Sequence, residues 1–151
     1  MSNADFNLIA RFLPNLYLIL DPQFNIVEAT DNYLETTYTK RENIVGKNVF
    51  EVFPDNPSDP TLEGRGVLIK SLKEVLATKK AHKMPMIKYD IKGIDNTFEE
   101  KWWSVVNTPV LKDNEVVYII NSVTDVTEIT KLKRFIDLQK LTLSLIASNP
   151  T

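Results

Sequence analysis

The stretch FEEKWWSVVNTPVL, residues 98–111, does most to decide the fold that this sequence predicts. Successive side chains of a β-strand point to opposite faces, so every second residue shares a face. One face of this stretch carries Trp103, Val105 and Asn107, and the other carries Trp102, Ser104 and Val106. A polar turn at 112–115 and a second apolar stretch at 116–125 follow, so the sequence predicts a long β-hairpin.

Upstream of this hairpin, two short strands and a helical region are expected. Residues 17–20 and 26–29 are apolar stretches separated by the turn residues DPQFN, which predicts a first hairpin. The period then changes from two to about 3.6. Asn32 and Glu35 have the spacing of a capping box, which predicts a helix that begins at Asn32.

The middle of the chain completes the order of elements. Residues 55–60 are rich in proline and polar turn residues, and predict an irregular loop. Leu68, Leu72 and Val75 lie on one face of an amphipathic helix, and a third strand is expected at about 84–92. Two strands, several helices and three strands in this order predict an α+β domain with an antiparallel sheet.

A long amphipathic helix is predicted after Val126. Asp125 and Glu128 have capping-box spacing at its start, and apolar residues recur every three or four positions up to Ile146. This stripe has to be covered by the sheet or by another chain. We therefore divide the sequence into a tag remnant and lead-in helix at 1–13, a domain at 14–126, and a linker or output helix at 127–151.

Composition excludes several classes of function. The chain has 151 residues, a formal net charge of -2, no cysteine and one histidine. The small negative charge argues against nucleic acid as a partner, and the lack of cysteine excludes disulfides and thiolate metal sites. No apolar run approaches the ~20 residues of a membrane helix and no signal peptide opens the chain, so we expect a cytoplasmic protein without membrane contact within this chain.

Several segments together resemble one family, the PAS sensor domains. They are YLILD at 17–21 with the strand that follows, IVGK at 44–47, WWSVVNTPV at 102–110, YII at 118–120 and DVTE at 125–128. The resemblance covers about residues 14–130, and the stretch from Trp103 to Val110 is similar to one found in PAS domains of bacterial sensor histidine kinases. It implies a PAS fold: a five-stranded antiparallel sheet, helices that cover one face and form a pocket, and a C-terminal amphipathic output helix.

The resemblance also implies a sensory role in bacterial signal transduction, as in two-component systems. The domain would bind a small-molecule ligand, form a homodimer, or both, and relay the signal through its last helix to a downstream kinase or other effector domain. The last helix has no phosphoacceptor histidine, and the chain has no Walker A loop and no nucleophile–base pair, so we expect no enzymatic activity here. The alternative is a ligand-free dimerisation or protein-interaction domain in which Trp103 fills the pocket.

The same resemblance implies which residues form the site. The pocket would be lined by one face of each strand of the long hairpin: Trp103, Val105, Asn107, Ile119, Asn121 and Val123. Asn107 and Asn121 would orient a ligand, or would instead bond to backbone or water in a filled core. Asp125 and Thr127 would relay the signal, and Asp125 would also cap the last helix. Trp102, on the outer face, needs cover from a terminal helix or from a dimer partner.

Cofactors are not favoured by the sequence. His82 is the one residue that could hold a haem, but its lysine-rich surroundings favour a solvated histidine near the end of a helix. Flavin adducts with cysteine and thioester-linked chromophores both need a cysteine, which the chain lacks. A haem or non-covalent flavin redox sensor is therefore the least favoured alternative, and no metal site is expected.

Overall fold

The computed structural model describes residues 3–53 and 64–148, so the loop expected at 55–60 lies outside the described residues. Its helices are α1 (Asn3–Arg11), α2 (Asp31–Thr37), α3 (Arg41–Ile44), α4 (Val49–Val52), α5 (Gly64–Thr78) and α6 (Thr127–Ser148). Its strands are β1 (Leu16–Leu20), β2 (Ile26–Ala29), β3 (His82–Lys83), β4 (Ile87–Lys88), β5 (Ile91–Lys92), β6 (Phe98–Glu99), β7 (Trp102–Lys112) and β8 (Glu115–Asp125).

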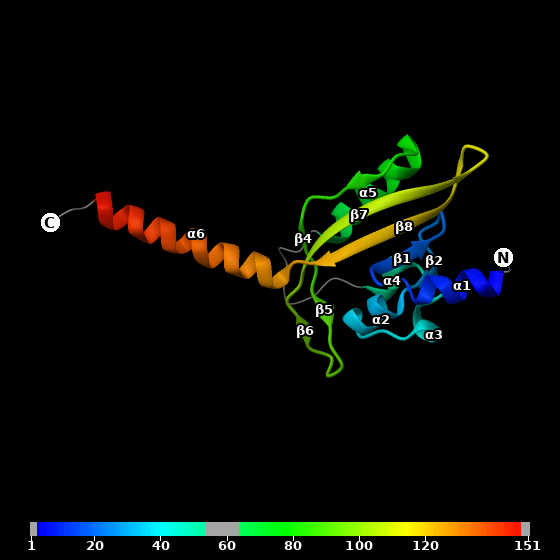
Figure 1. Cartoon of the computed structure of the whole chain (residues 1–151), viewed down its shortest axis with the longest axis horizontal. Helices are drawn as coiled ribbons and strands as arrows, with labels where there is room; N and C mark the ends of the chain where they lie inside the picture. The colour runs from blue at the N-terminus through cyan, green and yellow to red at the C-terminus, as the bar shows by residue number, and fades with distance from the viewer. Residues whose placement is uncertain (1–2, 54–63, 149–151) are drawn as a thin grey trace.

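The main sheet is antiparallel and has the strand order β2-β1-β8-β7-β3, as predicted for an α+β PAS fold (Figure 1). The edge position beside β7 is shared by two short strands, since β4 also pairs with β7. The prediction of a continuous strand at 84–92 is therefore wrong. Pro85, which has no N–H to donate to a ladder, separates β3 from β4, and β5 pairs with a different strand from β4. β5 and β6 form a separate two-stranded sheet.

The central hairpin has the alternation that the sequence predicted. β7 and β8 pair from Trp103 opposite Asp125 to Lys112 opposite Glu115, with one irregularity near Leu111. Trp103, Val105 and Asn107 are buried, whereas Trp102, Ser104 and Val106 are partly exposed. The first set therefore lies on the inner, helix-covered face of the sheet.

Short helices cover this inner face. The main hydrophobic core joins Leu18, Leu20 and Ile119 of the sheet to side chains of α2, α3, α4 and α5. A second, smaller cluster forms around Trp103 and Val105 together with Met84 and Ile91. The two clusters share several partly buried neighbours, so the inner face is one continuous apolar layer with the candidate site between its halves.

The first helix of this layer begins one residue after Thr30, not at Asn32 as the capping-box spacing predicted. Thr30 is buried, and its hydroxyl oxygen accepts from the backbone N–H of Tyr33 while its own hydrogen is donated to the carbonyl oxygen of Asn15. Asn32 instead donates from its side chain to the carbonyl oxygen of Pro14. The tertiary contact with the chain before β1 thus decides which residue caps α2.

A buried charge fixes the turn from β2 into these helices. Glu28 is 3% exposed, and its carboxylate lies 2.7 Å from Nε of Arg41 and 3.6 Å from Nε of Arg11. Arg41 also donates from Nη2 to Asp31 and to the carbonyl oxygen of Ala29, at 2.8 Å each. One guanidinium therefore ties the end of β2 to α2 and α3.

The last helix projects from the domain (Figure 1). Thr127 and Thr130 are buried in its first turn, and every residue from 131 to 148 is exposed. Arg134 lies 4.6 Å from the centre of the Trp102 ring, so α6 supplies the cover that Trp102 on the outer face was expected to need. Among the described residues, no helix combines the length and the apolar character needed to cross a membrane.

The Glu28–Arg41 pair generates a stability prediction. Arg41→Met would leave the buried Glu28 carboxylate with the backbone N–H of Ala29 and the more distant Arg11, and should lower the free energy of unfolding by about 3 kcal/mol. Urea denaturation measures the loss, with the neighbouring exposed Lys40→Met as control. Equal stability of the two variants would show that the ion pair between Glu28 and Arg41 does not stabilise the fold.

Candidate functional site

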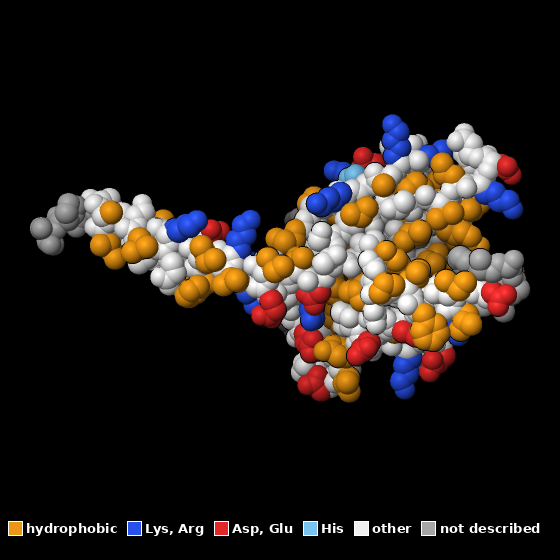
Figure 2. Space-filling model, viewed as in Figure 1, with side chains coloured by type: hydrophobic (Ala, Val, Ile, Leu, Met, Phe, Trp, Pro, Cys, Tyr) orange, Lys and Arg blue, Asp and Glu red, His pale blue; other side chains and the backbone are white. Residues whose placement is uncertain are grey.

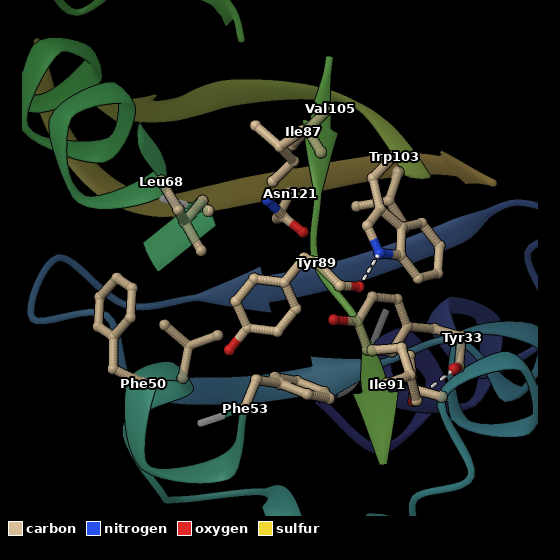
Figure 3. A pocket seen from close by; sticks show the side chains of 14 residues that line it. Tyr33, Phe50, Phe53, Leu68, Ile87, Tyr89, Ile91, Trp103, Val105 and Asn121 are labelled. Carbon is tan, nitrogen blue, oxygen red and sulfur yellow. Dashed lines mark hydrogen bonds between the residues drawn. The ribbon is translucent and has the colours of Figure 1, made fainter. Parts of the chain in front are cut away.

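A small cavity lies between the inner face of the sheet and the covering helices. Its volume is about 60 Å³. Figure 3 shows the side chains that surround it, which come from β7 and β8 on one side, from α2, α4 and α5 on another, and from the segment 87–91. The cavity therefore lies where the two hydrophobic clusters meet.

Four of the six ligand-binding residues expected from the sequence line this cavity. They are Trp103, Val105, Asn121 and Val123. The other two lie elsewhere on the same face: Asn107 is fully buried behind Asn121, and Ile119 is fully buried in the main core. The structure thus places four of the six predicted residues around the cavity and the other two in the packed interior.

Trp103 forms part of the cavity wall. Its indole Nε1–H donates to the carbonyl oxygen of Tyr89 at 2.8 Å, which holds the ring against the segment that follows β4 (Figure 3). Space remains beside the ring, among Tyr89, Val105 and Asn121. The indole is therefore hydrogen-bonded in place without filling the cavity completely.

The two asparagines bond to each other. Asn107 and Asn121 are directly opposite in the β7–β8 ladder, and Asn121 Nδ2 donates to Asn107 Oδ1 at 2.7 Å. Asn121 lines the cavity whereas Asn107 lies behind it, so the oxygen of the Asn121 amide is left on the cavity side. This oxygen is a hydrogen-bond acceptor in an otherwise apolar wall.

The helix side of the cavity is formed by residues that the sequence did not predict as part of the site. They include Tyr33 of α2, Phe50 of α4, Phe53 directly after α4, and Leu68 of α5. The apolar turn around Phe50 and Phe53 was the available signal, but only tertiary structure brings it over the sheet. Burial raises the pKa of the Tyr33 phenol, and the nearby Tyr89 adds to this rise, so the phenol stays neutral.

The lining of the cavity is mostly apolar and uncharged. Among the described residues that line it, none carries a charge, and the polar groups are the Asn121 amide, the Thr37 hydroxyl and two phenols. Such a lining offers neither a strong base nor a nucleophile with an activating partner. In the described part of the chain, no cluster of three His, Asp or Glu side chains could hold a metal ion.

His82 differs from its sequence expectation. It lies half-buried on the edge strand β3, and both ring nitrogens have partners: Nδ1 lies 2.7 Å from Ser71 Oγ, and Nε2 lies 3.1 Å from a Glu74 carboxylate oxygen. The sequence signal that could have found Ser71 is its place within the apolar face of α5, between Leu68 and Val75. Because both nitrogens are engaged, the ring is not available as a haem ligand in this arrangement.

The end of β8 is joined to α6 by a compact set of hydrogen bonds. Asp125 accepts from the backbone N–H and the hydroxyl of Thr127, and from Lys101 Nζ at 2.9 Å. Thr127 Oγ1 in turn accepts from the backbone N–H of Trp102 at 3.0 Å. The two residues expected to relay a signal therefore connect β7, β8 and the first turn of α6.

This junction makes stability depend on pH. Burial acts to raise the pKa of Asp125, but the hydrogen bonds from Thr127 and the charge of Lys101 outweigh it, so the pKa lies below the usual value. A depressed carboxylate pKa stabilises the fold above the unfolded value of about 3.9, and this stabilisation is lost as the pH falls further through the folded pKa. We expect Asp125→Asn to lower the melting temperature at neutral pH and to weaken its fall between about pH 4 and pH 2.

The exposed hairpin residue Asp113→Asn provides the matched control, since the same change in charge occurs without these partners. Melting curves recorded across this pH range compare the two variants with the parent chain. The same acid dependence in both variants would contradict the role assigned to Asp125.

Comparison with known proteins agrees with this geometry. A family model described as the PAS fold matches residues 12–130. The solved PAS domain of BvgS from Bordetella pertussis is 20% identical, with a TM-score of 0.62 over 93% of this chain and 96% of that one. No curated protein sequence is significantly similar to the chain.

Two further structures share the fold. A sensory box sensor histidine kinase from Vibrio cholerae is 18% identical, with a TM-score of 0.53 over 82% of this chain and 90% of that one. A LOV protein from Rhodobacter sphaeroides is 13% identical, with a TM-score of 0.62 over 84% of this chain and 69% of that one. At these identities the likeness concerns the fold alone, and the family model covers most of the sequence: the chain belongs to the PAS family.

Proposed function

We propose that this PAS domain senses a small molecule that binds in the cavity beside Trp103 and Asn121. The observation that carries the proposal is the cavity itself, a space of about 60 Å³ with an apolar lining and a single amide oxygen on its sheet side. Small-molecule sites are mostly apolar with a few placed polar groups. The hydrogen bond that holds Trp103 at the wall supports ligand binding over a pocket filled by that ring.

We further propose that the domain forms a homodimer through α6. Nine large apolar side chains of this helix, from Ile129 to Ile146, are between 43% and 69% exposed. Figure 2 shows apolar side chains along the visible face of the projecting helix. Exposed apolar surface of this extent marks interaction sites. A second copy of the chain fits it, because a two-fold axis would set the same stripe against itself.

The relay proposed between the two sites runs through Asp125 and Thr127. A ligand in the cavity contacts the inner face of β7 and β8, whose ends are tied to α6 by these two side chains. A ligand can shift the helix only if it binds one arrangement of these strands more tightly than another. The output would be a kinase or another effector domain downstream of α6, as in a sensor histidine kinase.

Native mass spectrometry of the purified protein, with an absorbance scan of the same sample, tests the ligand. We expect a folded species with extra mass that disappears on denaturation, because a ligand held between the sheet and the covering helices should dissociate slowly. A dimer at the apoprotein mass, after incubation with a library of small neutral compounds, would favour the ligand-free dimerisation domain instead. Visible absorbance would favour a haem or flavin sensor.

Dimerisation is tested by a charge in the α6 stripe. Leu138 is 60% exposed, so Leu138→Lys should leave the fold intact and should weaken the dimer at least tenfold. Analytical ultracentrifugation measures the dissociation constant. Ser144→Lys serves as the control, because Ser144 shares the polar face of α6 with Asp137 and Lys140. A dimer equally stable in both variants would exclude this stripe as the interface.

A further inference from the structure

A chain of hydrogen bonds crosses the inner face of the sheet from the surface to the cavity. The strand registers set its path: His82 of β3 is opposite Asn107 of β7, and Asn107 is opposite Asn121 of β8. These three polar side chains thus form one row across neighbouring strands. α5 packs over the row and adds Ser71 and Glu74.

The contacts along the row are short and continuous. Glu74 Oε2 lies 3.1 Å from His82 Nε2, and His82 Nδ1 lies 2.7 Å from Ser71 Oγ. Asn107 Nδ2 lies 2.9 Å from Ser71 Oγ, and Asn121 Nδ2 lies 2.7 Å from Asn107 Oδ1. The row therefore begins at a half-exposed carboxylate and ends at an amide that lines the cavity.

When the His82 imidazole is neutral, the Glu74 carboxylate at the start of the row fixes the direction of every hydrogen bond from His82 to Asn121. A carboxylate only accepts, so His82 presents Nε2–H to Glu74, which leaves Nδ1 as an acceptor. Ser71 then donates its hydroxyl hydrogen to Nδ1, and its oxygen accepts from Asn107. Asn107 Oδ1 accepts from Asn121, and the atom left on the cavity side is Asn121 Oδ1.

A second contact holds the middle of the row in the same sense. Asn107 Nδ2 also lies 3.3 Å from the sulfur of Met84, which accepts weakly and cannot donate. A reversed Asn107 amide would place its oxygen against this sulfur. Asn107 is 0% exposed, so no bulk water is available to compensate for that arrangement.

From this geometry we propose that the cavity selects small neutral molecules that carry an N–H or O–H donor, which they donate to Asn121 Oδ1. The proposal rests on the ligand-binding function above and adds the class of ligand. Asn121 contacts the ligand, whereas Glu74, His82, Ser71 and Asn107 are positioning residues that keep its oxygen turned to the cavity. A molecule that places an acceptor atom at this position would bring its lone pair against that of Asn121 Oδ1, with no hydrogen atom between them, and would bind less tightly.

Pyrrole and furan form the matched pair of probes. The two rings have nearly the same size and differ in that pyrrole presents an N–H where furan presents an oxygen atom. Titration of the protein, followed by the NMR signal of the Trp103 indole N–H, gives a dissociation constant for each ring. Because one hydrogen bond to a buried acceptor is gained, we expect pyrrole to bind about fivefold more tightly than furan.

Variants of the row distinguish a role in selecting ligands from a role in packing alone. Asn107→Leu combined with Asn121→Leu replaces both amides by groups of similar size, and should bring the ratio between the two rings to about one while furan still binds. Ser71→Ala interrupts the row with a single small change and should lower the ratio. Ser122→Ala, which alters the outer face of the same strand, should leave the ratio unchanged.

The direction of the row is tested independently by nitrogen NMR. The chain has one histidine, so its ring signals are assigned without ambiguity. In the neutral imidazole at about pH 8, we expect the tautomer with the proton on Nε2. A proton on Nδ1 would overturn the proposed direction.

The outcomes distinguish the two proposals. Equal affinity for pyrrole and furan in the parent chain would overturn the selection of donors and leave ligand binding intact. Binding of neither ring, with no shift of the Trp103 signal, would count against the cavity as a binding site and so against both proposals. A ratio that falls in Ser71→Ala but not in Ser122→Ala would support the row as the source of selectivity.

Discussion

The pairing of β7 with β8 is the constraint on which the rest of the structure depends. This ladder sets Asn107 opposite Asn121 and Trp103 opposite Asp125, so one register defines both the cavity wall and the start of α6. A slip by one residue would turn every inner side chain of one strand to the outer face. Burial of Trp103 and Val105 on one side and the helix contact of Trp102 on the other resist such a slip.

The sequence predicted the parts of the fold that have a local signature. Alternation in residues 98–111 divided the side chains of β7 between two faces, and the polar turn before β8 identified the hairpin. The sheet wall of the site followed, since Trp103, Val105, Asn121 and Val123 share that face. The choice of the inner face came from the likeness to PAS domains, because alternation alone is symmetric between the two faces of a strand.

What the sequence could not predict depends on contacts between distant segments. Thr30 caps α2 because Asn15 lies beside it, and Phe50 reaches the cavity only because α4 folds over the sheet. His82 was expected in solvent, since its neighbours in the sequence are lysines; its partner Ser71 is on another element. A polar residue within the apolar face of α5 was the visible clue to that contact, but the pattern does not identify its partner.

The attachment of α6 has a mechanical consequence. The helix has 22 residues and a length of about 33 Å, and its buried contacts lie within the first turn. A helix held mainly at one end converts a small rotation there into a larger displacement at its tip. A rotation of about 10° at Thr127 would carry the far end through about 6 Å, which is more than one helical turn. Displacements too small to disturb the packing around Asn121 would thus be magnified into a change of position at the tip.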